Sequence, residues 1–193
     1  MESYYFEEKG SSNTIKALEL AKEASVSFKL NTIVVASTKG ESALKASEVF
    51  HDPRYRLIIV KHHDGFREEG NEFLETVHNQ IQNKRPSTIF HVGTHALAGL
   101  ERTFRTVKVS QTMLPVEMIA MTLRRCFGDG TKVSLEMALM VSDSGLIKDM
   151  SEDIICIAGT GKGLDTAWIV TPAYTNQMFK LKMKIPICKP RNF

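Results

Sequence analysis

Two spacings of apolar residues alternate along the chain. Short runs of almost continuous apolar residues, rich in Ile and Val, are typical of buried β-strands. Between these runs, apolar residues recur at the three- to four-residue spacing of an amphipathic helix. The pattern predicts strands over residues 32–37, 56–62, 87–92, 153–159 and 166–172. It predicts helices over residues 14–25, 41–50, 71–84 and 114–130.

Three further segments are less regular. Residues 133–147 alternate apolar and other residues as a strand does, but they are rich in Leu, Glu, Met and Ala and are long for a strand, so we predict a helix. Residues 94–113 lack a clear period, and we expect an irregular loop there. Residues 178–188 have an extended pattern and are expected to pair with residues 3–6 near the N-terminus.

The order of these elements predicts the fold class. Strands that are apolar throughout and alternate with helices indicate a parallel sheet with helices on both faces. Only six residues separate the strands at 153–159 and 166–172, which is too few for a crossover, so these strands are expected to be antiparallel neighbours. With no long linker, repeat or low-complexity tract, we predict a single α/β domain over residues 1–193.

Composition supports an ordinary globular protein. The chain has 42% hydrophobic and 24% charged residues, and its net charge is only +3. No apolar run approaches the roughly 20 residues of a membrane span, and the acidic, aromatic N-terminus does not have the pattern of a secretory signal. We therefore expect a cytoplasmic protein without a membrane partner.

The charged residues and the cysteines narrow the function further. Lys180, Lys182 and Lys184 alternate with apolar residues, which is typical of the solvated face of an edge strand, so we do not predict nucleic-acid binding. The chain has three cysteines but no Cys-x-x-Cys pair, which argues against a zinc ribbon or a thioredoxin-type site. Cys156 lies in an apolar run and is expected to be a buried thiol.

The loops that follow the predicted strands are the first place to look for a site. In open α/β sheets, ligands bind at the carboxyl ends of the strands. Four such loops are richer than the rest of the chain in Gly, His, hydroxyl and charged residues: STKGES at 37–42, HHDGFREEG at 62–70, GTHALAGLER at 93–102 and GTGKGLD at 159–165. These loops are expected to meet at one edge of the sheet.

The STKGES loop has the parts of a phosphate site. A helix that begins at Glu41 offers unpaired backbone N–H groups and the positive end of its dipole. Hydroxyl groups, a basic side chain and a glycine accompany that helix start: Ser37, Thr38, Lys39, Gly40 and Ser42. The alternative is that the hydroxyls only cap the helix and the glycine only turns the chain. The spacing is not that of a Walker loop.

The glycine-rich loop at 159–165 allows two interpretations. Its glycines have the wrong spacing for a dinucleotide fingerprint, and a strand follows where a helix should. The loop is therefore either a cover over a ligand or a hairpin turn. As a cover, it would bring these residues to the site: Gly159, Thr160, Gly161, Lys162, Gly163, Asp165 and Thr166.

The histidine loops supply candidates for chemistry. His62 and His63 are adjacent on a strand and point in opposite directions, so a shared metal ion is not predicted. One of them is expected to hydrogen-bond a ligand or the loop backbone, with Phe66 either stacking on a ring or anchoring the loop. Further contacts are expected from Gly65, Thr94, Arg67 and Arg102. The catalytic candidates, if the protein is an enzyme, are His63, His95, Glu136 and Asp143.

The sequence resembles the C-terminal α/β domain of pyruvate kinase over about residues 13–172. The similarity lies in STKGESALKASEVF, RLIIVKHH and IICIAGTGKGLDTAWIV. It is closer to a group of stand-alone, mainly archaeal proteins that resemble this domain. The motifs of that group are seen here as VASTKGESA, HHDGFREEG, THALAG, LEMALMVSDSGLI, GLDTA and KPRNF.

The resemblance implies a three-layer α/β/α fold with a mixed five-stranded sheet, strand order 3-2-1-4-5 and an antiparallel last strand. It implies that residues 37–42 hold a phosphate, that residues 159–163 cover the ligand, and that the ligand is flavin mononucleotide (FMN). Pyruvate kinase activity is not expected, because the chain has no room for the catalytic barrel. The HHDGFREEG and THALAG loops have no counterpart in the kinase domain.

Three functions follow as hypotheses. The first is a binder of a phosphorylated small molecule, with FMN as the expected cofactor. The second is an enzyme, either a flavin-dependent oxidoreductase or a phosphatase- or isomerase-like protein. The third is a regulatory or assembly module analogous to the effector domain of pyruvate kinase. A homo-oligomer is also expected, on the ground that the C-terminal strand is an exposed edge.

Overall fold

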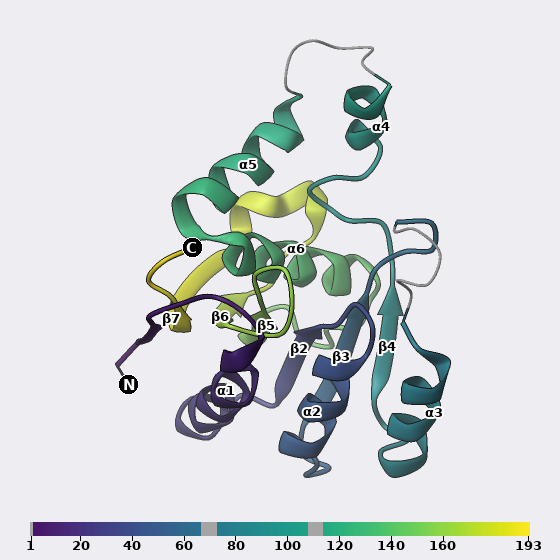
Figure 1. Ribbon diagram of the computed structural model, residues 1–193, viewed down its shortest axis with the longest axis vertical. Helices are drawn as coiled ribbons and strands as arrows, with labels where there is room; N and C mark the ends of the chain where they lie inside the picture. The colour runs from purple at the N-terminus through teal and green to yellow at the C-terminus, as the bar shows by residue number, and fades with distance from the viewer. Residues whose placement is uncertain (1, 67–72, 108–113) are drawn as a thin grey trace.

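The strands of the described residues all belong to one mixed sheet (Figure 1). The computed structural model describes residues 2–66, 73–107 and 114–193. The sheet has seven strands in the order β1-β7-β6-β5-β2-β3-β4. Their bounds are Tyr4–Phe6 for β1, Thr32–Ala36 for β2, Arg56–Lys61 for β3, Ile89–Val92 for β4, Ile154–Ala158 for β5, Thr166–Thr171 for β6 and Lys182–Pro190 for β7.

The expected α/β class is confirmed, but the expected count of five strands is wrong. The strands β4-β3-β2-β5-β6 follow the order 3-2-1-4-5, with β6 antiparallel to β5. Two strands extend this set, because β7 pairs antiparallel with β6 and β1 pairs parallel with β7. The predicted pairing of the C-terminal segment with the N-terminal residues is thereby confirmed. β1 pairs only with Cys188–Pro190, so residues 182–187 of β7 have β6 as their one strand partner in the described sheet, and the expected exposed edge remains there. The homo-oligomer stays a prediction.

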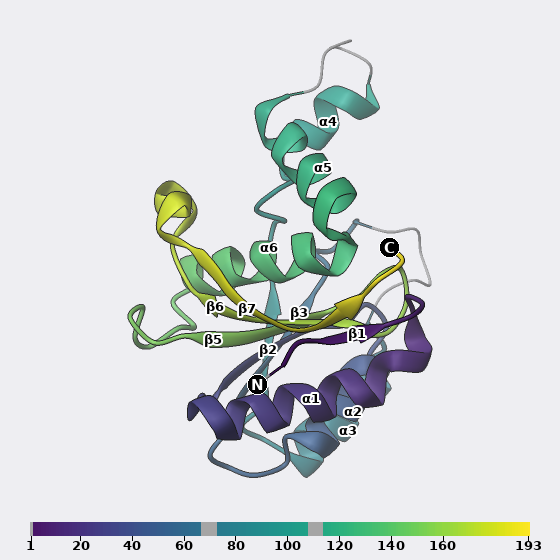
Figure 2. The same ribbon diagram turned by 90° about the vertical axis from the view of Figure 1, so that its left-hand side faces the viewer.

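Helices cover both faces of the sheet (Figure 2). One face carries α1, α2 and α3, and the other carries α6, with α4 and α5 beyond it. The bounds are Thr14–Phe28 for α1, Glu41–Val49 for α2, Glu75–Lys84 for α3, Glu101–Thr106 for α4, Pro115–Phe127 for α5 and Asp129–Asp143 for α6. Two 3-10 helices, η1 and η2, span Ser11–Asn13 and Thr175–Lys180.

Helices occupy much of the segments whose sequences were ambiguous or irregular. The ambiguous segment 133–147 is helical, as predicted, but only as far as Asp143, where α6 ends. This helix is buried from Gly130 to Ser142 except at Val133, and burial on all sides explains why its sequence lacks a clear helical stripe. The predicted loop at 94–113 contains the helix α4, and residues 108–113 lie outside the described residues. The predicted helix at 71–84 begins at Glu75, and residues 71 and 72 are not described.

Each face of the sheet has its own apolar core. The central strands β2, β3 and β5 contribute alternate residues to the two cores, as expected for strands that are buried on both faces. Ile33, Leu57 and Ile155 face α1, α2 and α3. Val34, Ile58 and Cys156 face α6, and the predicted burial of Cys156 is confirmed. These strands therefore fix the position of every loop at their carboxyl ends.

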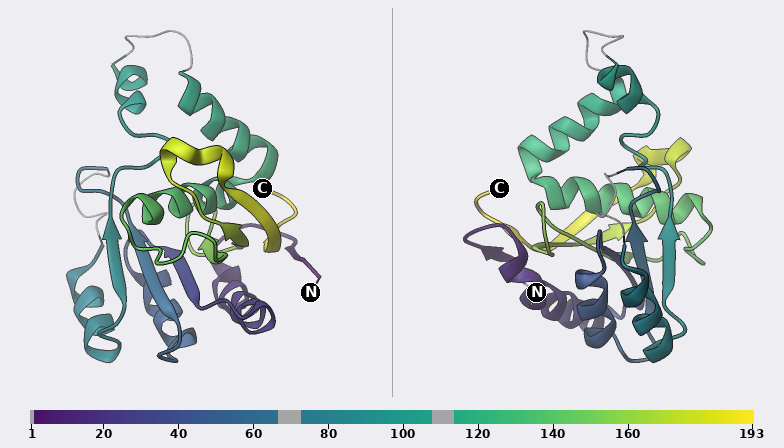
Figure 3. Two further views of the ribbon diagram at one scale, coloured as in Figure 1. Left: turned by 180° about the vertical axis from the view of Figure 1, so that it is seen from behind. Right: turned by 45° about the vertical axis from the view of Figure 1, so that its right-hand side comes forward.

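Helices α4 and α5 project beyond the layer formed by α6 (Figure 3). Between them they expose Leu100 just before α4, Phe104 within it, and Met118 and Phe127 on α5. Only Ala120 of α5 is buried. Among the described residues, no helix is both long enough and apolar enough to cross a membrane.

Candidate functional site

The carboxyl ends of the central strands border a cavity of about 580 Å³. This volume lies within the range of small-molecule sites in proteins. The predicted loops do meet here, since each of them contributes to the lining. Among the lining residues are Ser37, Thr38, Lys39, Glu41, Ser42, Lys61, His62, Phe66, His95, Ala98, Arg102, Arg124, Asp129, Lys132, Glu136, Gly159, Gly161, Lys162 and Gly163.

The STKGES loop has the helix-capping role that was one of its two predicted roles. The Ser37 hydroxyl accepts a hydrogen bond from the Ala43 N–H at 3.2 Å, so it caps the first turn of α2. The Ser37 N–H donates to the Val60 carbonyl at 3.0 Å, which holds the loop against β3. Thr38, Lys39 and Ser42 line the cavity beside this cap. The loop is therefore anchored by Ser37 and presents its other polar side chains to the cavity.

Gly40 is required at its position, although it does not line the cavity. Its φ is 111°, in the left-handed region where a side chain is strained. A Cβ atom at Gly40 would lie 2.7 Å from Cγ1 of Val77 on α3. The Leu74 N–H also donates to the Lys39 carbonyl at 3.2 Å. The start of α3 thus packs directly on the loop that precedes α2.

The charge around the cavity favours an anion. Helices α2 and α6 both direct their N-terminal residues at it, Glu41 and Ser42 from α2 and Asp129 and Lys132 from α6. Helix N-termini carry a partial positive charge. Six basic and three acidic side chains line the cavity: Lys39, Lys61, Arg102, Arg124, Lys132 and Lys162 against Glu41, Asp129 and Glu136.

A chain of hydrogen bonds runs from the STKGES loop to His95. The Thr38 hydroxyl lies 3.2 Å from Nε2 of His62, and Nδ1 of His62 lies 3.0 Å from Nε2 of His95. Both ring nitrogens of His62 therefore have partners, which fixes the plane of its ring. This chain connects the start of α2 to the loop after β4.

An aromatic cluster forms the neighbouring wall of the cavity. The rings of Phe66 and His62 stack with centroids 4.4 Å apart and an angle of 13° between their planes. The Phe66 and His95 centroids are 4.3 Å apart, and the Arg102 guanidinium lies 4.5 Å from the centre of the Phe66 ring. Phe66 thus anchors the loop, as one of its two predicted roles required, and it also lines the cavity.

His95 is neutral at physiological pH. Burial lowers its pKa from 6.5 to about 4, and this effect outweighs the attraction of the Glu136 carboxylate, which acts in the opposite direction. A neutral imidazole has one nitrogen that donates and one that accepts a hydrogen bond. Near neutral pH His95 can therefore donate or accept a hydrogen bond to a ligand in the cavity, but with a pKa of about 4 it is a weak base there.

The most buried charges of the cavity wall are Lys132 and Glu136, one turn apart on α6. The Lys132 Nζ lies 2.5 Å from Oε2 of Glu136, and the two side chains are 3% and 5% exposed. Oε1 of Glu136 accepts the Leu97 N–H at 2.8 Å, so the pair also holds the loop after β4. The sequence analysis identified Glu136 but missed Lys132. The available signal was a charged pair at a spacing of four residues within a helix that is otherwise largely apolar.

A second cavity of about 650 Å³ adjoins the first. The two share Ala98, Arg102, Arg124, Asp129 and Lys132 as lining residues. The remaining wall of the second cavity comes from both chain ends, from α5 and from two loops: Lys9, Leu97, Glu117, Ala120, Met121, Arg125, Thr160 and Phe193. Arg124 and Asp129 form an ion pair at 2.7 Å within the shared wall.

Two residues predicted to contact the ligand are structural instead. Asp165 is fully buried, and its carboxylate accepts hydrogen bonds from the Gly10 N–H at 2.9 Å, the Thr160 N–H at 3.1 Å and the Thr166 hydroxyl at 2.8 Å. Thr166 is 2% exposed and packs against Gly130 at the start of α6. Both side chains point into the protein, because the chain enters β6 at this point.

The glycine-rich loop is a tight turn that also borders the cavity. A Cβ atom at Gly159 would lie 2.2 Å from the Gly163 carbonyl oxygen, and one at Gly163 would lie 2.4 Å from the Cα of Ser11. These two glycines are required for close packing of the backbone. Gly161, by contrast, has open space around it at a φ of 74°. Of the predicted contacts in this loop, Thr160 lines the second cavity and not the first.

Asp143 does not lie with the other catalytic candidates. It is seven residues beyond Glu136, about two turns farther along α6. Its carboxylate accepts hydrogen bonds from the N–H and the hydroxyl of Thr175, at 3.0 and 2.7 Å. It therefore caps the start of η2, away from the other catalytic candidates.

Three further predicted residues lie beside the cavity without lining it. The Nδ1 atom of His63 is 2.8 Å from the Asp64 carbonyl, and the ring packs edge-on against Phe66. Gly65 forms the turn at a φ of 73°, and Thr94 is exposed. Of the two adjacent histidines, His62 and not the catalytic candidate His63 lines the cavity. Arg67 lies outside the described residues.

The described part of the chain contains no group of three or more His, Cys, Asp or Glu side chains placed to hold a metal ion. No known protein-family model matches the sequence. The site must therefore be interpreted from its own geometry and charge.

Proposed function

We propose that the protein binds a phosphorylated small molecule, and specifically FMN, at the carboxyl ends of the central strands. One observation carries the proposal: the anchored loop at residues 37–42, the start of α6 and an excess of basic side chains meet on one cavity. A dianionic phosphate group is the ligand that helix N-termini and basic side chains together favour. The phosphate would lie at Thr38, Lys39 and Ser42.

The aromatic cluster supports a flat ring as the other end of the ligand. His62, Phe66 and His95 bring three rings to the wall of the same cavity. Aromatic side chains favour stacked or edge-on contact with a planar ligand. The similarity to stand-alone proteins that resemble the pyruvate kinase domain favours FMN among the ligands that combine a phosphate with such a ring.

The same similarity supports an evolutionary interpretation of the sheet. We infer that β4, β3, β2, β5 and β6 correspond to the five strands of the C-terminal domain of pyruvate kinase, and that β7 and β1 are additions. The order of the five strands and the antiparallel direction of β6 support this inference.

Calorimetric titration with FMN, riboflavin and inorganic phosphate tests the proposal. We expect FMN to bind. Riboflavin should bind at least about tenfold more weakly, because it lacks the phosphate that the helix N-termini attract. The protein as purified should show a flavin absorbance band. Equal affinity for FMN and riboflavin would contradict the phosphate site, and no binding of FMN would contradict the cofactor.

A pair of lysine variants locates the phosphate. Lys39→Ala should weaken FMN binding by roughly three- to tenfold, since one charged contact at a partly exposed site is lost, while riboflavin binding stays the same. Lys45→Ala on α2 is the matched control, because Lys45 does not line either cavity. Equal weakening in both variants would place the phosphate elsewhere.

A flavin-dependent enzyme is the second candidate function, and His95 favours it. This side chain lines the cavity and is held neutral by burial, with a pKa of about 4, which suits a hydrogen-bond donor to negative charge that develops on a reacting group. The catalytic candidate that the geometry favours is therefore His95 and not His63. Loss of turnover at unchanged ligand affinity in a His95→Gln variant would distinguish an enzyme from a binding protein.

A further inference from the structure

The wall between the two cavities contains a lysine that the proposed function does not use. Lys132 is 2% exposed, yet it is among the lining residues of both cavities. Its ammonium group is 2.5 Å from Oε2 of Glu136, and the other carboxylate oxygen is held by the Leu97 N–H. The lysine therefore has a carboxylate fixed beside it and open volume on either side.

This environment is suited to a reactive amine. Burial lowers the pKa of Lys132, against the opposing effect of Glu136. Buried lysines are the ones that serve as nucleophiles toward carbonyl groups, because only the free amine attacks. The Glu136 carboxylate is placed to accept the proton that the ammonium must lose first.

The second cavity determines which carbonyl compounds can reach Lys132. Its lining has five basic and two acidic side chains: Lys9, Arg102, Arg124, Arg125 and Lys132 against Glu117 and Asp129. A positive excess of this kind attracts anions and raises their local concentration. An aldehyde or ketone with a carboxylate or phosphate group is favoured over a neutral one.

We propose that Lys132 forms an imine with an anionic aldehyde or ketone bound in the second cavity. The Lys132 ammonium passes a proton to Glu136, and the free amine attacks the carbonyl carbon. The resulting carbinolamine loses its hydroxyl as water, with Glu136 returning the proton. The products are a protonated imine and water, so charge and atoms balance, and no oxidant or reductant is needed. This site is separate from the phosphate position at residues 37–42.

Trapping with glyoxylate, the smallest anionic aldehyde, tests the inference on the unmodified protein. Sodium cyanoborohydride reduces any imine to a stable secondary amine, which peptide mass mapping assigns to a residue. At pH 7 fewer than about one in a thousand ordinary exposed lysines is a free amine. We expect Lys132 to be labelled at least several-fold faster than Lys9, which is exposed in the same cavity, because burial lowers the pKa of Lys132 and Glu136 lies beside it to accept the proton.

Two comparisons make the test decisive. Lys132→Arg keeps a cation beside Glu136 but cannot form an imine, so labelling at residue 132 should disappear while labelling of Lys9 persists. Propanal, a neutral aldehyde, should label Lys132 more slowly than glyoxylate does. Labelling of Lys132 no faster than that of Lys9 would overturn the inference, and equal labelling by propanal would overturn the preference for anions. Neither outcome depends on whether FMN binds.

Discussion

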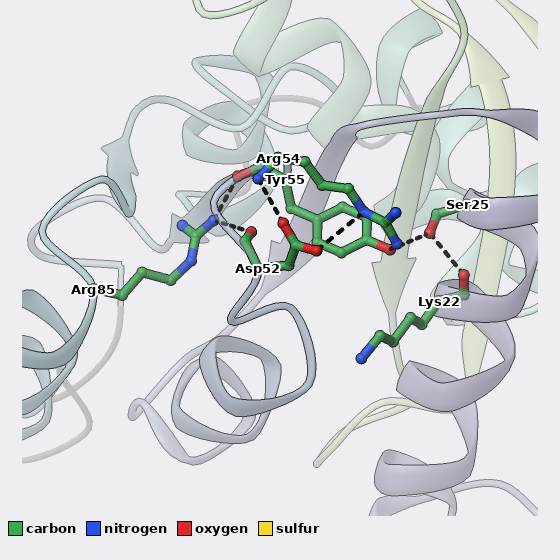
Figure 4. Close-up of polar contacts among 6 residues, drawn as sticks. All are labelled: Lys22, Ser25, Asp52, Arg54, Tyr55 and Arg85. Carbon is green, nitrogen blue, oxygen red and sulfur yellow. Dashed lines mark hydrogen bonds and ion pairs between the residues drawn. The ribbon is translucent and has the colours of Figure 1, made fainter.

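One basic side chain is buried at the amino ends of the strands and another at their carboxyl ends, but their surroundings differ. At the amino ends of the strands, Arg85 is 6% exposed, and its guanidinium donates hydrogen bonds to the Tyr55 carbonyl at 2.5 Å and to the Asp52 carbonyl at 3.4 Å (Figure 4). At the carboxyl ends, Lys132 pairs with a carboxylate beside two cavities. Arg85 thus holds neighbouring loops together, whereas Lys132 borders two cavities.

Apart from the buried Nε of Arg85, which has no hydrogen-bond partner among the described residues, the polar groups of the amino-end cluster bond to one another. The Tyr55 hydroxyl lies 3.0 Å from the Ser25 hydroxyl and accepts a hydrogen bond from Arg54 at 2.6 Å (Figure 4). Arg85 therefore fastens the ends of helices and the starts of strands to one another and lines neither of the two cavities. The comparison teaches that burial of a charge alone does not identify a site, and that the volume beside the charge is the distinguishing feature.

The largest expected effect is that of Lys132→Met. This variant should lower the free energy of unfolding by about 3–5 kcal/mol, because it leaves the buried Glu136 carboxylate without its partner. The double variant Lys132→Met/Glu136→Leu should recover only part of this loss, since it removes the unpaired charge but also leaves the Leu97 N–H without its acceptor. Urea denaturation at pH 7 measures both. A single variant as stable as the wild type would show that the pair is not buried as described.

The variant Arg85→Met should have a smaller effect, confined to stability. Removing the guanidinium leaves the carbonyl groups of Asp52 and Tyr55 without a buried donor, which should cost about 2–3 kcal/mol in the free energy of unfolding. FMN affinity should not change, because Arg85 borders neither cavity. Urea denaturation and calorimetry test the two parts. Weaker FMN binding in this variant would show that the packing at the amino ends of the strands affects the cavity at their carboxyl ends.

The smallest expected effect is a loss of stability in acid that depends on His95. Its pKa is about 4 in the folded protein, against 6.5 for an unperturbed histidine side chain. Between these values the unfolded chain binds more protons, so stability is complete above pH 6.5 and falls as the pH falls toward 4. We expect a contribution of about 1 kcal/mol, below the limit for full burial, because solvent reaches part of the ring.

Urea denaturation from pH 7 to pH 4, compared with His95→Gln, isolates this contribution. The variant should lose less stability over that interval than the wild type. Burial also lowers the pKa of His91, which does not line either cavity, so part of the acid dependence should persist in the variant. An identical slope in both proteins would show that His95 is protonated as readily in the folded state as in the unfolded chain.

The sequence was sufficient for the central strands, because β2, β3 and β5 are buried on both faces and are therefore apolar at almost every position. The pairing of β7 with β1 also followed from the extended pattern at the two chain ends. The count of five strands came from the resemblance, which covers neither β1 nor β7. Lys182 and Lys184, which were assigned to an edge, lie in the part of β7 that β1 does not cover, because β1 pairs only with Cys188–Pro190.

The parts of the site that lie on loops at strand ends could be predicted from the sequence. The parts that depend on packing between residues far apart in the chain could not. The loops after β2, β3, β4 and β5 meet because parallel strands end at one edge. Lys132 and Arg124 lie on helices, and their place in the cavity wall depends on how α5 and α6 cross the sheet. Asp165 and Thr166 look like loop residues in the sequence, but contacts with Gly10 and Gly130 bury them.

The buried carboxylate of Asp165 also limits how the cavity can open. It joins the β1–η1 connection, the glycine turn and the first residue of β6 through three hydrogen bonds. The turn at 159–163 cannot swing outward as an independent flap unless the bond from Thr160 breaks or the segment around Gly10 travels with it. Access from that side is thus governed by a residue that lines neither cavity.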